Sequence, residues 1–184
     1  MPGLRIVNYP EPVLRAKGAP VREFGAPLRR TAEAMLATMR EAKGLGLAAP
    51  QVGLSLQFFV VDVSREPEPV ELDGKPVADA STLMPMAFAN AEVDILPGEP
   101  ELVEEGCLSF PGIRGDVPRV ERCAVRFRDL DGAPRTLVCS GLLARCIQHE
   151  HDHCQGVLFI DRMTGPHRLR IESKLKRLVR EPRG

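Results

Sequence analysis

The run Gln-His-Glu-His-Asp-His-Cys-Gln-Gly, residues Gln148 to Gly156, decides how the rest of the sequence is interpreted. In a helix, His149 and His153 would lie about one turn apart, so both imidazoles could bind one metal ion with Glu150 beside them. In a strand, alternate residues share a face, and His149, His151 and His153 would form a row. The residues just before the run distinguish these two interpretations.

Those preceding residues favour a helix. Leu142, Leu143, Cys146 and Ile147 form a stripe at helical spacing, whereas a half-buried strand would alternate apolar and polar residues. We therefore predict a helix from Gly141 to about Gln155.

The predicted helix orients its two carboxylates differently. Glu150 would lie toward the apolar stripe, where burial raises the pKa of a carboxylate toward the value of a neutral-pH general base. Asp152 would point nearly opposite. A surface helix can carry such a pattern without metal, and a catalytic site usually has three protein ligands. A metal site would therefore need a third ligand from elsewhere in the chain.

The composition indicates one ordinary domain. The chain has 184 residues, of which 43% are hydrophobic, and 25 basic residues balance 25 acidic ones. This balance gives no argument for DNA as a partner, and no apolar run is long enough for a membrane. No targeting segment is evident, so we expect a cytoplasmic protein. Its five cysteines form no CxxC pair, which favours reduced thiols.

Periodicity and turn residues predict the other elements. The first 25 residues read as an extended arm with one helical turn near Pro12 to Ala16. The remaining segments are expected to be a helix (Pro27 to Ala42), a strand (Gln57 to Val63), a turn at Asp73-Gly74, one or two strands (Leu83 to Ile95), a loop (Pro97 to Pro118), two strands (Glu121 to Arg128, Arg135 to Ser140), a short strand (Val157 to Ile160) and a helix (Pro166 to Arg180).

Two segments contain residues suited to a site. The small-residue loop from Gly44 to Gly53 has no Gly-Lys-Ser/Thr ending and precedes a strand, which argues against a phosphate loop. Small residues also let a backbone approach a substrate closely, and Gln51 is the side chain there that can donate a hydrogen bond. Gln51 could equally be a satisfied turn amide. For Cys107, in the other loop, we propose metal ligation.

Three separated motifs together resemble peptide deformylase. They are the loop from Gly44 to Gln51, the Glu-Gly-Cys-Leu-Ser segment from Glu105 to Ser109, and the helix segment from Gln148 to His153. The resemblance covers nearly the whole chain. It implies an α+β fold in which antiparallel strands surround the helix that carries the histidines.

The resemblance also implies roles for individual residues. Cys107, His149 and His153 match the metal ligands, and Glu150 matches the catalytic carboxylate. Gln51 and the Leu108 N–H match the groups that steady the formyl oxygen. The positions matched to substrate binding are Gly44, Leu45, Gly46 and Gly106, which form backbone walls for an added strand, and Arg114, near the substrate's chain.

The implied reaction removes the N-formyl group from the starting methionine of nascent polypeptides and gives formate. The resemblance implies one divalent metal ion, with Fe(II) as the active metal in the cell. A thiolate with two imidazoles also suits Zn, Ni or Co.

Two places depart from the family pattern: Arg145, and Asn90-Ala91-Glu92, which resembles the family's Asn-Pro-Glu without its proline and is not expected to affect the chemistry. Arg145 stands where the family commonly has an apolar residue lining a substrate pocket, so we expect a preference for acidic or polar residues at the second substrate position. Alternatively, Arg145 reaches solvent or pairs with a nearby acid. His151 and Cys154 occupy variable positions, and solvent exposure is expected for His151.

The sequence is also compatible with two other functions. A His-Glu-x-x-His metallopeptidase typically draws its third ligand from downstream, where no clear motif follows His153. An inactive deformylase-like protein could be a ribosome-associated binding module. In the active enzyme too, the basic face of the helix from Pro166 to Arg180 could dock on the ribosome, although such a face is usually only solvated.

Overall fold

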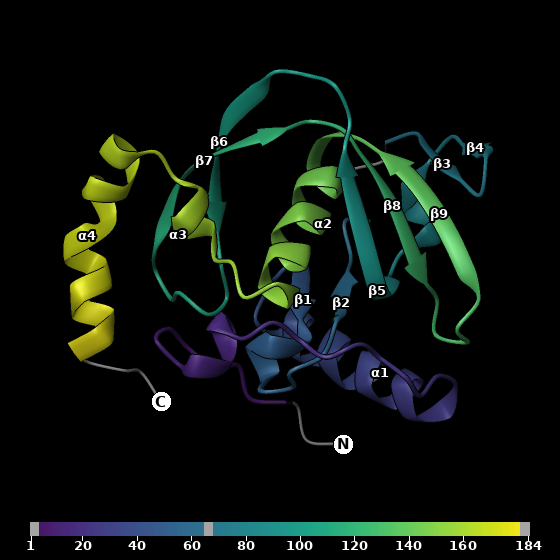
Figure 1. Ribbon diagram of the computed structural model, residues 1–184, viewed down its shortest axis with the longest axis horizontal. Coiled ribbons are helices and arrows are strands. Elements are labelled where there is room, and N and C mark those ends of the chain that lie inside the picture. Colours follow the sequence, from purple (N-terminus) through teal and green to yellow (C-terminus); the bar gives the residue numbers. More distant parts are fainter. Residues whose placement is uncertain (1–3, 65–67, 181–184) are drawn as a thin grey trace.

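The computed structural model describes residues 4–64 and 68–180, and helix α2 (Gly141–Cys154) lies at the centre of the molecule in Figure 1. Antiparallel strands surround this helix, so the predicted α+β class is confirmed. The first three residues of the predicted N-terminal arm lie outside the described residues. From Leu4 onward the arm runs extended, with one helical turn at Pro12–Arg15 as expected.

The remaining elements have the following bounds. The strands are β1 (Gly46–Ala48), β2 (Phe58–Val61), β3 (Val70–Leu72), β4 (Lys75–Val77), β5 (Met86–Ile95), β6 (Pro100–Gly106), β7 (Arg114–Val120), β8 (Cys123–Arg128) and β9 (Pro134–Cys139). The helices are α1 (Ala26–Glu41), α3 (Phe159–Arg162) and α4 (Gly165–Arg180), with short 3-10 turns at Ala49–Val52 and Ala80–Leu83.

Two antiparallel sheets frame α2. Seven strands pair in the order β1-β2-β5-β8-β9-β3-β4, and β6 pairs with β7 in a separate hairpin. Among the described residues, β1 is one of the two edge strands of the large sheet, and β6 has β7 as its one partner. Each of these two strands therefore has an unpaired side.

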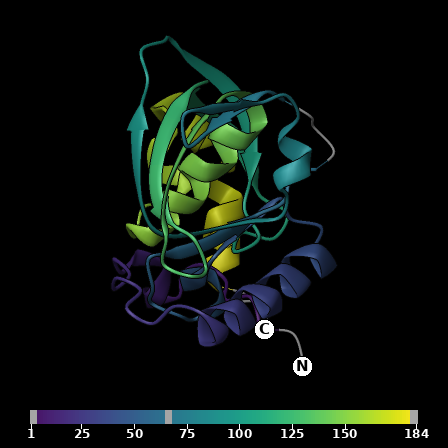
Figure 2. The same ribbon diagram turned by 90° about the vertical axis from the view of Figure 1, so that its right-hand side faces the viewer.

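The predicted apolar stripe of α2 is buried against the large sheet. Leu143, Ala144 and Ile147 are almost fully inaccessible and share a core cluster with Phe88 and Leu137. The helix from Gly141 is thus confirmed, because local periodicity and tertiary burial agree. Helix α1 packs on β1 and β2 and runs along one end of the molecule in Figure 2.

The predicted loop from Pro97 to Pro118 is wrong, because most of it forms the β6–β7 hairpin. Pro100 begins β6 and Pro118 faces Leu102 across the ladder. Proline lacks an N–H, but a two-stranded ladder leaves one side of every strand unpaired and so tolerates it. The turn between the strands, residues 107–113, is what remains of the loop.

The predicted strand from Val157 to Ile160 is also wrong, because α3 begins at Phe159. The Asp161 side chain accepts a hydrogen bond from the Leu158 N–H at 2.9 Å and so caps this short helix. Leu158, Phe159 and Ile160 are all buried, in a cluster with α4 and β7. A short continuous apolar run has no period that separates a strand from a buried helical turn.

Candidate metal centre

Cys107 meets both imidazoles of α2. It lies directly after β6, and its Sγ is 3.2 Å from Nε2 of His153. The ligand atoms of Cys107, His149 and His153 all lie within 4.8 Å of one another. Within residues 4–64 and 68–180, no other group of three or more His, Cys, Asp or Glu side chains gathers in this way. The structure therefore brings the three predicted ligands together.

The donor set fits a divalent metal ion. The Nδ1 of His149 is 2.9 Å from a Glu105 carboxylate oxygen, so its Nε2 is the nitrogen left to bind a metal. Burial lowers the pKa of His153 well below its usual value, and the charges of His149 and Arg119 act in the same direction. A neutral imidazole is what a metal requires. One thiolate with two imidazoles suits a tetrahedral site for Zn, Fe(II), Co or Ni.

Glu150 is buried beside these ligands, as predicted. Its side chain is nearly inaccessible, and its Oε2 has no hydrogen-bond partner among the described residues. Burial raises its pKa to about 7, and the neighbouring Glu105 carboxylate acts in the same direction. A carboxylate with this pKa can both accept and release a proton near neutral pH.

The glycines of the small-residue loop touch other site residues. A Cβ atom on Gly44 would lie 2.7 Å from Leu108 Cδ1, and one on Gly46 would lie 2.5 Å from Glu150 Oε1. Helix α1 ends before this loop, and the left-handed residue that follows is Lys43, at φ 57°. Gly44 and Gly46 are thus needed for close packing rather than for ending the helix.

Gln51 is oriented by the backbone and directed at the thiol. Its Oε1 accepts a hydrogen bond from the Ala48 N–H at 2.8 Å, which fixes the amide orientation. Its Nε2 then donates toward Ser109 Oγ at 3.3 Å and Cys107 Sγ at 3.5 Å. The amide is therefore satisfied at one end and presents donors to the metal centre at the other.

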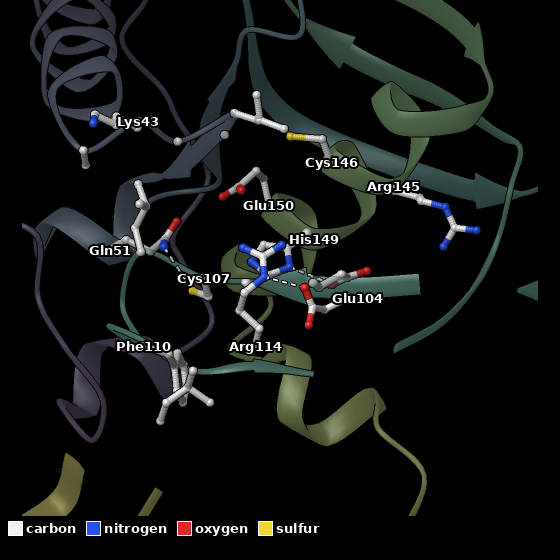
Figure 3. A pocket seen from close by; sticks show the side chains of 18 of the residues that line it. Lys43, Gln51, Glu104, Cys107, Phe110, Arg114, Arg145, Cys146, His149 and Glu150 are labelled. Carbon is white, nitrogen blue, oxygen red and sulfur yellow. Dashed lines mark hydrogen bonds and ion pairs between the residues drawn. The ribbon is translucent and has the colours of Figure 1, made fainter. Parts of the chain in front are cut away.

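A cavity of about 490 Å³ opens at this centre. Figure 3 shows Gln51, Cys107, His149 and Glu150 gathered around it. All but one of the predicted site residues line the cavity; the exception is His153, which lies behind the thiol. The lining members of the predicted set are Gly44, Leu45, Gly46, Gln51, Gly106, Cys107, Leu108, Arg114, Arg145, His149 and Glu150.

The two predicted arginines lie in the wall of this cavity, each with an acidic partner. Arg114 donates to Glu104 at 2.7 Å, and both side chains are exposed. Arg145 is almost buried and donates to Glu101 at 3.0 Å. Its guanidinium is directed away from Cys107 and His149 in Figure 3. Arg145 therefore pairs with a nearby acid and does not extend into solvent.

A buried ionic network behind the metal ligands was not predicted. Arg119 is almost inaccessible and binds Glu105 through two nitrogens, at 2.5 and 3.1 Å. It also donates to Asp152 at 3.0 Å, and Arg162 binds the same carboxylate at 2.6 Å. Asp152 does point away from the apolar stripe, but toward this network rather than toward water. The network fixes Glu105, which orients His149.

The two variable positions on α2 do not join the metal ligands. His151 is half-buried, and not solvent-exposed as predicted. Its Nε2 lies 3.3 Å from Nε2 of Gln155. Burial lowers the pKa of His151. Cys154 is buried in the core, and its thiol donates to the Phe58 carbonyl at 3.6 Å.

Comparisons with known proteins agree on one family. A family model described as polypeptide deformylase matches residues 4–169. A peptide deformylase of Opitutus terrae is 52% identical over 96% of this chain and 93% of its own length, and one of Methylacidiphilum infernorum is 42% identical over 96% and 93%. The crystal structure of a peptide deformylase from Synechococcus elongatus in complex with actinonin has a TM-score of 0.81 and 39% identity, covering 96% of this chain and 86% of that one.

Proposed function

The chain belongs to the polypeptide deformylase family, and on that premise we propose that the cavity at Cys107 is where it hydrolyses the formyl group of N-formylmethionyl peptides. The products are formate and a peptide with a free amino terminus. The observation that carries the proposal is that Cys107, His149 and His153 converge within 4.8 Å beside the buried Glu150.

We propose that Cys107, His149 and His153 hold one divalent metal ion, as the dependence of the family on a metal requires. When bound, such an ion acidifies water and polarises a carbonyl group. All three donors suit Fe(II), and the family resemblance makes Fe(II) our proposal for the metal in the cell, with Zn, Ni and Co as alternatives. Metal analysis of protein prepared without oxygen, with turnover measured on the same sample, tests this choice.

Glu150 is proposed as the group that moves the proton. With a pKa near 7, its carboxylate can take a proton from the attacking water and pass it to the departing nitrogen. Gln51 Nε2 and the N–H of Leu108, which directly follows Cys107, are proposed to donate hydrogen bonds to the former carbonyl oxygen as negative charge develops there. Losing one such donor commonly raises the barrier by about 2.7 to 4 kcal/mol.

The unpaired strand edges support a binding mode for the peptide. Gly46 lies in the edge strand β1, Gly106 ends β6, and the cavity lies between them. An extended peptide adds to an exposed edge through main-chain hydrogen bonds. We propose that the formylated peptide lies as a strand here, with Gly44 and Leu45 as further backbone wall and Arg114 beside its later residues.

The experiment is an assay for formate release from formyl-Met-Ala-Ser by the Fe(II)- or Ni(II)-loaded protein. We expect Glu150→Gln to lose about 100-fold or more in turnover while keeping its metal. Cys107→Ser is expected to lose metal and turnover together. A Glu150→Gln protein as active as the wild type would overturn the proposed proton transfer.

The other two functions are not favoured. The third metal ligand is Cys107, upstream of the helix, and not a downstream residue as in the metallopeptidases. The downstream His167, on α4, instead pairs with Asp116 of β7 at 2.8 Å. An inactive binding module would have no need for the buried carboxylate of Glu150 at an assembled ligand set.

Ribosome docking through α4 stays a prediction, as does a cytoplasmic location. Deleting the helix is not a clean test, because Ile171, Leu175 and Leu178 are buried in the core. Exchanging the exposed Lys174 and Arg177 for glutamate would reverse two charges without opening the core. Unchanged cosedimentation with ribosomes would end the idea. None of the helices in the described ranges combines the length and apolarity of a membrane span.

A further inference from the structure

Two cysteines outside the metal centre face each other on neighbouring strands of the large sheet. Cys123 is the first residue of β8, Cys139 is the last residue of β9, and the two are direct cross-strand partners. Their sulfurs are 3.7 Å apart, and both side chains are buried. Both are free thiols, and the pair belongs to the core beneath α2.

The backbone already satisfies the geometry of a disulfide. Directly opposed residues of an antiparallel pair have Cα atoms about 4.5 or 5.5 Å apart, and disulfides span Cα distances of about 4.4 to 6.8 Å. The sulfurs would have to approach to about 2.05 Å, which requires rotation of side chains rather than movement of strands. Register and proximity together therefore make this pair ready for cross-linking.

The contact between the two sulfurs also favours their oxidation. The contact between the two sulfurs, in which either thiol can donate, lowers the pKa of Cys123 and raises that of Cys139, while burial opposes ionisation of both. A thiolate is the form that reacts with oxidants. Both cysteines are at strand ends, and Cys123 also faces Ile95 in β5, whose side chain is half-exposed. Strand ends open more easily than strand centres, which gives a small oxidant access.

We propose that Cys123 and Cys139 form a reversible disulfide when the protein meets hydrogen peroxide. One sulfur attacks the peroxide O–O bond and becomes a sulfenic acid, and water leaves. The second sulfur then attacks the sulfenic sulfur, the S–S bond forms, and the sulfenic oxygen leaves as a second water with the remaining thiol proton. Two thiols are thus oxidised by two electrons, and one peroxide is reduced to two waters.

The disulfide would restrain the end of β9, which directly precedes the helix that carries His149 and His153. Ser140 and Gly141 follow Cys139 directly, and α2 starts at Gly141. A bond from Cys139 to β8 would fix the point from which the helix with His149 and His153 begins. It would also close a loop between residues 16 positions apart, which restricts the unfolded chain.

The test uses the zinc-loaded protein, because zinc is not redox-active and holds the Cys107 thiolate. After peroxide treatment, free thiols are alkylated in denaturant and the chain is cut with trypsin without reduction. Cleavage after arginine places Cys123 in residues 123–126 and Cys139 in residues 136–145, while Cys107 is in a peptide ending at Arg114 and the remaining two cysteines share residues 146–162. Each thiol of the pair is therefore identified by its own peptide.

We expect peptides 123–126 and 136–145 to be joined, lighter than their sum by two hydrogens, and separated again by dithiothreitol. The oxidised protein should melt about 5 °C or more higher than the reduced one. Cys154→Ala, which removes a buried thiol outside the pair, should cross-link like the wild type, and Cys139→Ala should leave Cys123 as a trappable sulfenic acid. The proposal is overturned if both cysteines stay alkylatable, if either joins another thiol, or if the cross-linked protein melts lower.

Discussion

Glu150 lies directly against the backbone of Gly46, so that a Cβ atom on Gly46 would be 2.5 Å from Oε1 of Glu150. Alanine at this position would therefore displace the carboxylate from its place beside the proposed metal ligands. A displacement of about 1 Å at a reacting group can cost about 100-fold in rate, and we expect a loss of this size in kcat/KM for Gly46→Ala with unchanged metal content.

The control for this variant is Gly165→Ala. A Cβ atom on Gly165 would meet no other atom within 4 Å, so the change introduces alanine without a contact. Turnover of Gly165→Ala should match the wild type. Full activity in Gly46→Ala would show that Glu150 can shift without consequence, against its proposed role.

The raised pKa of Glu150 predicts how the metal-free protein responds to pH. Its carboxyl has a pKa of about 7 in the folded state against 4.5 ordinarily, chiefly because it is buried. Below pH 4.5 both states are protonated. Between pH 4.5 and about 7 the unfolded state loses this proton while the folded state keeps it, so the free energy of unfolding falls as pH rises.

Glu150→Gln has no such proton to lose, so this part of the pH dependence should disappear in the variant. Urea unfolding of both metal-free proteins at several pH values measures it, and Glu150→Gln should gain stability relative to the wild type as pH rises through this window. Parallel pH profiles for the two proteins would contradict the raised pKa.

The sequence predicted those features whose cause is local. The apolar stripe of α2 repeats within a few residues, and Asp73-Gly74 adopts the two positive φ angles of a tight hairpin turn between β3 and β4. Cys107, His149 and His153, which converge in the structure, were also predicted as a group, because each of the three short motifs keeps its residues together in the chain.

Features that depend on distant partners were missed. Arg119 reads as one basic residue among many, and only the β6–β7 ladder places it opposite Glu101 and within reach of Glu105 and Asp152. Its partners are 14 and 33 residues away in sequence. The sequence of β7 does not alternate apolar and polar residues, since Val117 and Val120 are three residues apart, and the glycines and prolines of the segment indicated a loop.

The missed network gives a prediction about metal affinity. Burial opposes ionisation of Glu105, but hydrogen bonds from His149 and Arg119 outweigh it and lower the pKa of Glu105 to about 2, so it is ionised when it holds the His149 ring. Partners that orient a ligating histidine commonly contribute about 10- to 100-fold to metal affinity. We expect a loss of that size in Glu105→Gln, measured by competition with a chelator.

Glu104→Gln is the matched control for that variant. Glu104 is the preceding residue, exposed and paired with the exposed Arg114, so the same chemical change there touches no metal ligand. Its metal affinity should equal that of the wild type. Equal losses in both variants would mean that general charge, and not the contact with His149, sets the affinity.

The pairing of Arg145 with Glu101 affects the expected substrate preference. Glu101 is exposed and offsets the charge of Arg145, which weakens the preference for an acidic second residue that the sequence alone suggests. Removing the offset in Glu101→Gln should raise kcat/KM for formyl-Met-Asp peptides relative to formyl-Met-Ala peptides. Because the Glu101 side chain is 62% exposed, solvent screens this pair as it screens exposed pairs, which contribute about 0.2 to 1 kcal/mol, so we expect a rise of at most about fivefold. Arg145→Leu should shift the same ratio in the opposite direction. A contact between Arg145 and the second side chain of the substrate has to respond to both changes of charge. If neither variant changes the ratio of kcat/KM values, Arg145 forms part of the cavity wall without contacting that side chain.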